Sequence, residues 1–392
     1  MKRIYLDYNA TTPIREEVLE AMLPYLREQF GNPSSIHYFG QTVKKGLEEA
    51  RERVARLIGS HPAEIVFTGS GTESSNLAIR GVAHEKRDKG RHIITSSIEH
   101  HCVLNTCRQL EKEGFRITYL PVDPYGLIHP DDVMKAITEE TTLITLMHAN
   151  NEVGTVQPIE TVGKISQDHG ILFHTDAVQS AGKIPLDVNQ LGADLLSMSA
   201  HKVYGPKGVG ALFIREGTPL HPLIHGGHQE MDRRAGTENV AGIVGFGIAA
   251  ELASSALKIK QEEIRSLRDY FWERIQQEID DARLNGDPIK RLPNTLSVGF
   301  EHIEGESLVI NLDLHGIAVS AGSACTSGAL DPSHVLVAMG IPETVAKGTL
   351  RFSLGNDTTK EEIDRTVEVL TEVVTRLRSM SPLYADMKKG KK

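Results

Sequence analysis

The amino-acid sequence predicts an α/β protein, with a large unit built on a mainly parallel β-sheet flanked by helices and a smaller α+β unit after it. Short apolar runs alternate with helical patterns from about residue 45 to residue 215. Such alternation is typical of parallel strands joined by helical crossovers that cover both faces of a sheet. After Thr237 the pattern changes to one long helical stretch, and 392 residues are enough for two hydrophobic cores.

The elements of the large unit are recognised by their apolar spacing. Leu47, Ala50 and Val54 share one face of a helix expected over residues 44–59, which Gly59 ends. A glycine turn and a helix that begins near Glu73 follow the first strand. The strands expected in this unit span residues 64–68, 91–95, 116–120, 143–149, 171–175, 194–199 and 210–214.

A long helix over residues 240–281 is expected to connect this unit to the C-terminal one. The smaller unit shows a final helix over residues 359–380 with Ile363, Val367 and Leu370 on one face, and strands over residues 295–300, 317–320 and 349–354. The predicted division is an N-terminal arm that contacts the small domain (1–14), a large domain (15–255), a small C-terminal domain (256–380) and a polar, basic tail (381–392).

Composition narrows the class of protein. Hydrophobic residues make up 40% and charged residues 24% of the chain, as in an ordinary globular protein. No run approaches the roughly 18 uninterrupted apolar residues of a membrane-spanning helix, and the net charge of −9 argues against direct binding of nucleic acid. Three cysteines are too few for a disulfide framework, and Cys102 and Cys107 are expected as small core residues. We therefore expect a cytoplasmic protein with no membrane contact.

Two neighbouring strand ends carry the polar residues of a cofactor site. The strand over residues 171–175 is followed by Asp176 and, three residues later, Gln179, and the strand over residues 194–199 ends in Ser199, followed by His201 and Lys202. A primary amine can form a Schiff base with pyridoxal phosphate, a carboxylate can pair with its pyridinium nitrogen, and a hydroxyl and an imidazole can bind its phosphate. Gln179 can donate to the phenolic oxygen of the ring. The alternatives are a solvated loop lysine at 202 and a helix cap at 176.

Further polar groups follow other strands. Gly71 and Thr72 belong to a glycine turn before a helix, which by itself is either an ordinary turn or a phosphate site. His100 and His101 follow another strand, and spacing alone does not choose which of them stacks on the cofactor ring. Asn151 follows the strand over residues 143–149, at the sheet edge where ligands bind in open α/β folds.

Two residues of the C-terminal unit complete the prediction. Cys325 lies in a run of small residues, 320–329, where we expect an accessible loop and a reactive thiol, with an incidental thiol as the alternative. Arg351 stands in an apolar strand and needs an anion, which is either a substrate carboxylate or a structural carboxylate. No metal-ligand spacing is found, so no metal site is expected, and a contact between Cys325 and a nascent iron–sulfur cluster is left open.

Together these motifs resemble the cysteine desulfurases of the NifS and IscS type, in the class V aminotransferase group of pyridoxal phosphate enzymes. The likeness runs over essentially the whole chain. Its motifs are residues 6–13, 30–35, 72–73, 99–100, 150–154, 176–179, 199–202, 236–239 and 323–327.

The resemblance implies the type I fold of pyridoxal phosphate-dependent aminotransferases and selects His100 as the ring-stacking acid–base group. It implies that Thr237 reaches the cofactor phosphate of a neighbouring subunit, so a homodimer is expected. It assigns Asn32, Asn151 and Arg351 to the substrate carboxylate and the ring, and it suggests a sulfur acceptor, either an iron–sulfur scaffold protein or a tRNA-thiolation protein.

The implied reaction converts L-cysteine to L-alanine through a pyridoxal phosphate aldimine. Lys202 removes the α-proton, His100 assists proton transfer, and Cys325 captures the sulfur as a persulfide for transfer to the acceptor. The rival hypotheses are a selenocysteine lyase or an aminotransferase on the same fold and, more distantly, a non-catalytic scaffold. A transaminase needs no loop thiol, and a scaffold would tolerate loss of Lys202.

Overall fold

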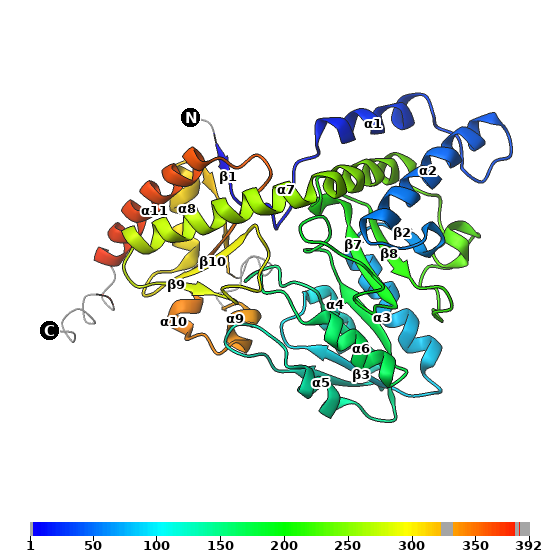
Figure 1. Ribbon diagram of the computed structural model, residues 1–392, viewed down its shortest axis with the longest axis horizontal. Coiled ribbons are helices and arrows are strands. Elements are labelled where there is room, and N and C mark those ends of the chain that lie inside the picture. Colours follow the sequence, from blue (N-terminus) through cyan, green and yellow to red (C-terminus); the bar gives the residue numbers. More distant parts are fainter. Residues whose placement is uncertain (1–2, 323–331, 381–383, 385–392) are drawn as a thin grey trace.

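The structure is a computed structural model that describes residues 3–322, 332–380 and 384. It has two parts, each with its own sheet, and the long helix α7 (Val240–Glu278) runs from one to the other (Figure 1). The described N-terminal strand β1 (Ile4–Tyr5) lies with the C-terminal part, where it pairs in parallel with β11 (Ile317–Ala318). The chain therefore begins beside its own C-terminal unit and then crosses to the large sheet.

The large sheet has seven strands in the order β2-β8-β7-β6-β5-β3-β4. All are parallel except β8, which is antiparallel to both of its neighbours. Only residues 200–209 separate β7 from β8, and a parallel return needs a crossover of roughly a dozen residues or more. The prediction of a mainly parallel sheet is confirmed. The strands are β2 (Ile65–Thr68), β3 (His92–Ser96), β4 (Arg116–Leu120), β5 (Thr141–Met147), β6 (Leu172–Asp176), β7 (Leu195–Ser199) and β8 (Gly210–Ile214).

Both faces of this sheet are buried under helices, as predicted. Successive strand residues point to opposite faces, so Phe67 and Phe213 enter one hydrophobic core while Val66 and Leu212 enter another. The helices of this part are α1 (Glu16–Arg27), α2 (Tyr38–Leu57), α3 (Gly71–Lys86), α4 (His101–Lys112), α5 (Pro130–Ala136) and α6 (Ile159–Asp168).

The smaller part has an antiparallel sheet in the order β12-β13-β10-β9. Phe271, Phe300 and Phe352 lie at the centre of its core. The strand predicted over residues 317–320 is divided in the structure into β11 and β12, which pair with different partners. The remaining elements are β9 (Ala282–Asn285), β10 (Thr295–Phe300), β12 (Ser320–Ala321), β13 (Thr349–Ser353), α8 (Gly305–Leu314), α9 (His334–Ala338), α10 (Glu343–Ala346) and α11 (Lys360–Met380).

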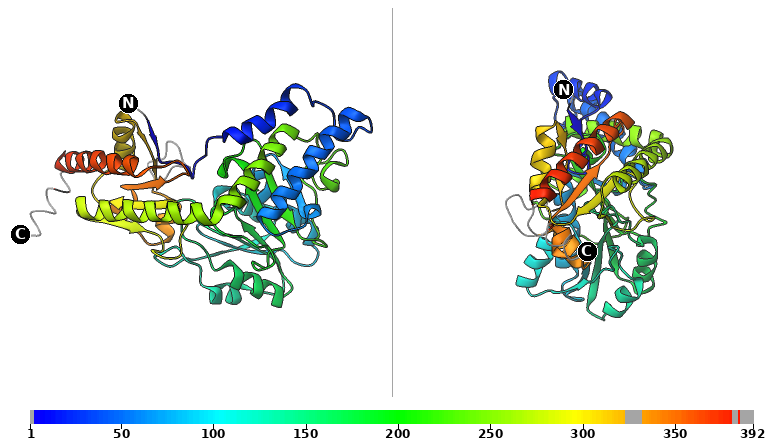
Figure 2. Two further views of the ribbon diagram at one scale, coloured as in Figure 1. Left: turned by 45° about the horizontal axis from the view of Figure 1, so that its top comes forward. Right: turned by 90° about the vertical axis from the view of Figure 1, so that its left-hand side faces the viewer.

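Helix α7 is shared by the two cores. Phe246 and Ala250 in its first half pack into the core of the large sheet, and Ile264 and Phe271 in its second half pack into the smaller core, where α11 lies alongside it (Figure 2). At 39 residues the helix is about 58 Å long. By length and composition alone it could cross a membrane, but half of its apolar window is buried inside the protein. It is thus one long helix that belongs to both parts and helps to fix them against each other.

Candidate active site

A cavity of about 420 Å³ opens at the carboxyl ends of β5, β6 and β7, a common ligand position in open α/β sheets. The N-terminal arm, the start of α3 and strand β13 complete its wall. Its size is that of a small-molecule site. The residues expected at the cofactor or substrate that line it are Gly71, Thr72, His100, Asn151, Asp176, Gln179, Ser199, His201, Lys202 and Arg351.

One end of the cavity is built to receive an anion. Ser70 caps α3 by accepting a hydrogen bond from the backbone N–H of Glu73 at 3.1 Å, so the first turn of the helix, with Gly71 and Thr72, begins at the cavity wall. The N–H groups of a helix N-terminus attract negative charge. A Cβ atom on Gly71 would lie 2.7 Å from Val178 Cγ2, so glycine is required for this close packing.

Ser199 lies beside Gly71, whose added Cβ would be 3.3 Å from Ser199 Cβ, and His201 lines the same cavity. His201 Nδ1 lies 3.1 Å from Thr11 Oγ1 in the N-terminal arm. Burial, and then the charge of Lys202, lowers the pKa of His201 to about 4. A neutral imidazole still offers one N–H donor, so the residues at this end fit a phosphate group.

Asp176 ends β6 inside the cavity. Its Oδ1 atom accepts a hydrogen bond from Val178 N at 2.9 Å, so the residue does cap the following turn, and no hydrogen bond to Oδ2 is found among the described residues. Burial raises the pKa of Asp176 from 3.8 to about 6. A buried carboxylate is costly without a positive partner, and a pyridinium nitrogen is a partner of the right charge. Asp176 therefore fits the cofactor that the sequence predicts.

The structure distinguishes the two adjacent histidines. His100 lines the cavity, whereas the ring of His101 packs against His334 with centroids 4.7 Å apart. His100 Nδ1 accepts a hydrogen bond from Cys102 N at 3.1 Å, which leaves the proton of the neutral ring on Nε2. Burial, then the charge of Lys202, lowers the pKa of His100 to about 4. His100 is therefore a neutral group that can pass a proton within the cavity.

The amine of Lys202 is held at the cavity by backbone oxygens of the N-terminal arm. Its Nζ atom donates to the carbonyl oxygens of Asn9 at 2.5 Å and Ala10 at 2.8 Å. Lys202 lies in a 3-10 turn directly after β7, and Tyr204 next to it has a positive φ of 66°. The lysine is thus a fixed part of the cavity wall, in contrast to the solvated loop lysine of the alternative hypothesis.

Arg351 on β13 projects into the cavity from the smaller part of the molecule. Its Nη2 atom donates to Asp7 Oδ1 at 2.8 Å and to Ser320 Oγ at 3.1 Å, and Nη1 donates to the carbonyl oxygen of Asn151 at 3.1 Å. Its Nε atom is buried with no hydrogen-bond partner among the described residues. The structural salt bridge that the sequence left open as an alternative is therefore present. One N–H group of the guanidinium still lacks an acceptor.

Three of the expected site residues are not in this cavity. Asn32 is exposed at the tip between α1 and α2, where its Oδ1 atom accepts a hydrogen bond from Ser34 N at 2.9 Å. Thr237 lines a separate, smaller depression together with Arg234. Cys325 lies outside the described residues, although Ser320, five positions before it, lines the cavity. The roles predicted for these three residues stay predictions.

Sequence reasoning assigned no role to several residues that the structure places at the site. Asp7 and Asn9 come from the N-terminal arm, and Cys102 lines the cavity while also packing against the core. Burial raises the pKa of the Cys102 thiol well above its usual range, so the thiol stays protonated. Cys107 is fully buried, as expected. The motif over residues 6–13 was the only signal for the arm residues, because their contacts to the site are far apart in sequence.

Comparisons with known proteins agree with this site. Residues 4–366 match the family described as aminotransferase class-V. The chain is 55% identical over 393 aligned positions to a cysteine desulfurase IscS of Dictyoglomus turgidum, with full coverage of both chains. Among solved structures it is similar to a NifS-like protein (TM-score 0.90, 41% identity, 96% of this chain and 100% of the other). It is also similar to SspA in complex with cysteine (TM-score 0.81, 41% identity, 91% of this chain and 100% of the other).

The family model covers most of the chain, and the fold and the cavity residues agree with it. The predicted resemblance and the predicted fold class are confirmed. The chain belongs to the class V aminotransferase family.

Proposed function

We propose that this chain is a pyridoxal phosphate-dependent cysteine desulfurase. It converts L-cysteine to L-alanine and transfers the sulfur to Cys325, where a persulfide forms. The observation that carries the proposal is the convergence of Lys202, Asp176, His100 and Arg351 on one cavity. These are the four groups that the reaction needs for the amine, the ring nitrogen, proton transfer and the substrate carboxylate. The names of the similar proteins, one of them described in complex with cysteine, support the same substrate.

When bound, pyridoxal phosphate supplies an aldehyde that links to amines and a ring that draws electrons from the substrate α-carbon. Asp176 would hold the ring nitrogen in its protonated form. The start of α3 with Gly71 and Thr72, and the Ser199–His201 pair, would hold the phosphate. Gln179 would donate to the phenolic oxygen.

The protein's own groups position the substrate and move protons. Arg351 binds the α-carboxylate through its Nη groups, in competition with Asp7, and Asn151 lies beside it. Lys202 is the base for the α-proton, and the carbonyl oxygens of Asn9 and Ala10 hold its amine in place. His100, with its proton on Nε2, exchanges a proton with the substrate.

Sulfur transfer balances without a further reactant. The Cβ–S bond of cysteine breaks, a new S–S bond forms to the Cys325 thiolate, and the carbon that loses sulfur takes up a proton to give alanine. One thiol and cysteine thus become one persulfide and alanine. The persulfide sulfur then passes to an acceptor, an iron–sulfur scaffold protein or a tRNA-thiolation protein, in the cytoplasm.

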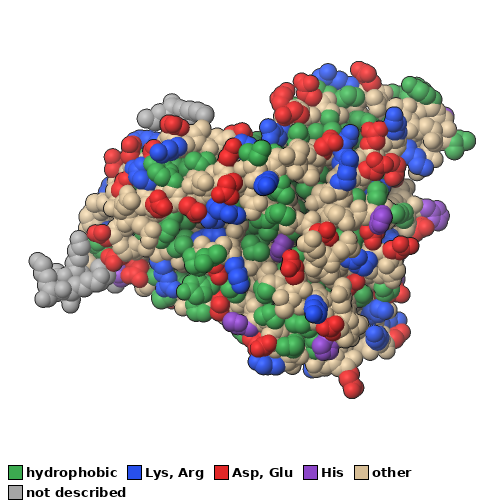
Figure 3. Space-filling view, in the orientation of Figure 1, with side chains coloured by type: hydrophobic (Ala, Val, Ile, Leu, Met, Phe, Trp, Pro, Cys, Tyr) green, Lys and Arg blue, Asp and Glu red, His purple; other side chains and the backbone are tan. Residues whose placement is uncertain are grey.

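A homodimer is part of the proposal. Large apolar side chains are exposed around Asn32 at the tip between α1 and α2, including Phe30 (75% exposed) and Ile36 (93% exposed). Hydrophobic side chains are visible at this projecting end in Figure 3. The exposed rings of Phe30, Tyr38 and Phe39 contact one another, and an exposed apolar cluster of this kind marks an interaction site. A partner subunit that covers it would bring its own cavity toward Asn32 and Thr237.

The test measures alanine release from L-cysteine and labelled sulfur on the protein, with the cofactor absorbance followed in parallel. The wild-type protein is expected to release alanine and to carry the label on Cys325. Cys325→Ala should keep the bound cofactor but lose both products, while Lys202→Ala should lose covalent attachment of the cofactor. A Cys325→Ala variant with wild-type alanine release would overturn the role of Cys325 as the sulfur acceptor. A wild-type protein that binds the cofactor but releases no alanine from L-cysteine would overturn the desulfurase proposal in favour of a transaminase or a selenocysteine lyase.

A further inference from the structure

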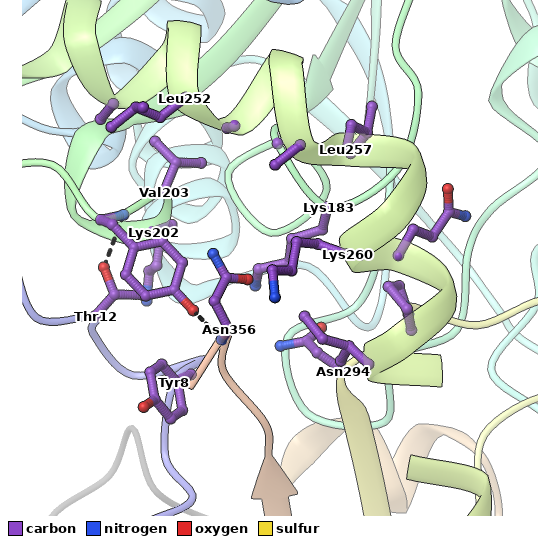
Figure 4. Close-up of a pocket in the computed structure, with 18 of the residues that line it drawn as sticks. Tyr8, Thr12, Lys183, Lys202, Val203, Leu252, Leu257, Lys260, Asn294 and Asn356 are labelled. Carbon is purple, nitrogen blue, oxygen red and sulfur yellow. Dashed lines mark hydrogen bonds between the residues drawn. The ribbon is translucent and has the colours of Figure 1, made fainter. Parts of the chain in front are cut away.

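A second cavity, smaller than the first, lies behind Lys202. It has a volume of about 50 Å³ and lies between the middle of α7, residues 249–264, and the N-terminal arm (Figure 4). Three lysines border it: Lys183, Lys202 and Lys260. Lys202 lines both cavities, so the second cavity lies on the opposite side of this lysine from the main cavity.

Lys183 is the lysine with contacts that point toward the active site. Its Nζ atom donates to Gln179 Oε1 at 2.9 Å and to Asn9 Oδ1 at 3.2 Å. It follows Gly182, whose positive φ of 72° allows the sharp turn after β6 that returns residue 183 toward residue 179. Because the Lys183 amine is the donor in both contacts, Gln179 and Asn9 must each turn a side-chain oxygen toward it.

The contact with Lys183 fixes the amide of Gln179. An amide side chain can in principle take two orientations that exchange its oxygen and its NH₂ group. With Oε1 turned toward Lys183, the Nε2 atom donates to the carbonyl oxygen of Asn9 at 3.0 Å. Gln179 also lines the main cavity, and the second N–H of Nε2 is left for a ligand there.

Asn9 receives the same kind of constraint. Its Oδ1 atom accepts from Lys183 and from Asn294 Nδ2 at 3.0 Å, and its Nδ2 atom donates to Thr295 Oγ1 at 2.8 Å. Its carbonyl oxygen is the shared acceptor of Gln179 Nε2 and Lys202 Nζ. Lys183 therefore touches both residues that orient groups at the cofactor, although it does not line the main cavity itself.

We propose that Lys183 is a positioning residue for the cofactor, which turns the Gln179 amide so that its N–H faces the phenolic oxygen and holds Asn9 against Lys202. The inference rests on the proposed function, because it needs pyridoxal phosphate in the main cavity. Burial, then the charges of Lys202 and Arg351, lowers the pKa of Lys183 well below its usual range. In either protonation state the amine has at least two N–H groups, one for each of the two oxygens it contacts.

Lys183→Met keeps the length of the side chain and removes the donors. We expect the dissociation constant of pyridoxal phosphate to rise by about 10-fold to 100-fold, because a buried amide left free to flip would set its oxygen against the oxygen of the cofactor. The absorption maximum of the bound cofactor should shift as well. Lys183→Arg keeps a donor and should recover most of the affinity. Lys260→Met is the matched control, since Lys260 borders the same small cavity but pairs with Glu263.

A double-mutant cycle separates positioning through Gln179 from a general structural role. Because Lys183 acts mainly through Gln179 and also holds Asn9, Lys183→Met should have a clearly smaller effect on affinity in the Gln179→Ala background than in the wild-type background. An equal loss in both backgrounds, or a Lys183→Met protein that binds the cofactor as tightly as wild type, overturns the inference.

Gln179→Glu gives an independent test if Lys183→Met does not fold. The carboxylate pairs with Lys183 and leaves no N–H for the phenolic oxygen. It should lower cofactor affinity by a similar factor while the cofactor-free protein keeps its unfolding temperature. Unchanged affinity in this variant also overturns the inference. Cofactor binding by the wild type is measured first. Its absence would reject the proposed function, whereas wild-type binding with no effect of the variants rejects only the role of Lys183.

Discussion

Asp176→Asn is expected to stabilise the cofactor-free protein and to weaken cofactor binding at the same time. The asparagine keeps an Oδ1 acceptor for Val178 N, so the local turn is preserved. What changes is the charge. Without the cofactor, the Asp176 carboxylate is buried without the pyridinium as its partner. Its pKa is raised from 3.8 to about 6, mainly by burial.

The magnitude follows from that pKa. A carboxyl group whose pKa is raised from 3.8 to about 6 costs about 3 kcal/mol in its charged form at pH 7. The folded protein binds the proton more tightly than the unfolded chain does, so this cost is absent below about pH 4, grows between pH 4 and pH 6, and is complete above. With cofactor bound the sign reverses, because a buried pyridinium loses its partner at a cost of about 3–5 kcal/mol.

The assay is urea unfolding of the cofactor-free proteins from pH 4 to pH 8, with cofactor titration at pH 7.5. The variant should be up to about 3 kcal/mol more stable than wild type above pH 6, and this advantage should vanish toward pH 4. Its cofactor affinity should fall at least about 100-fold. Asp168→Asn, at the exposed end of α6, is the control. A cofactor-free variant that is less stable than wild type at pH 8 would refute the reasoning.

Three further predictions test other parts of the site and its support. Asp7→Asn should lower the KM for L-cysteine about 3-fold to 10-fold in steady-state assays, because the substrate carboxylate no longer competes with Asp7 for the Arg351 guanidinium. An unchanged KM would count against this competition. Gly71→Ala should weaken cofactor binding about 10-fold in a titration, because its Cβ would lie 2.7 Å from Val178 Cγ2. Wild-type affinity would show that Val178 can move to accept the methyl group. Glu230→Gln should cost about 3 kcal/mol in urea unfolding, because the buried Arg51 loses its bidentate carboxylate and keeps only the half-exposed Glu48 at 3.3 Å. A loss under about 1 kcal/mol would contradict this.

The sequence predicted what depends on local pattern. The strands of the large sheet and their helical connections follow from apolar spacing. The sequence alone therefore places Asp176 and Lys202 at neighbouring strand ends. The reversed direction of β8 was not predicted, although the short connection over residues 200–209 contains the reason. The division of residues 317–320 into two strands depends on their pairing with β1 and β13. The alternation of apolar residues within this short segment does not predict that division.

Long-range contacts account for what sequence reasoning missed at the site. Asp7 and Arg351 are 344 positions apart and meet only because β1 and β13 belong to the same part of the fold. The choice between His100 and His101 could not be made from spacing, because both follow the strand. The structure separates them, since one faces the cavity and the other packs on His334.

The N-terminal arm explains why the site needs both parts of the molecule. Asn9 forms hydrogen bonds to both parts of the molecule. Its backbone N–H donates to Ser353 Oγ on β13, and its carbonyl oxygen accepts from Lys202 Nζ after β7. Removing the arm would take the Asn9 and Ala10 carbonyl oxygens away from the Lys202 amine and the Asp7 carboxylate away from Arg351. The amine that is to take the α-proton and the guanidinium that is to bind the α-carboxylate are therefore positioned by the same few residues. A shift of the smaller part must change the distance between them.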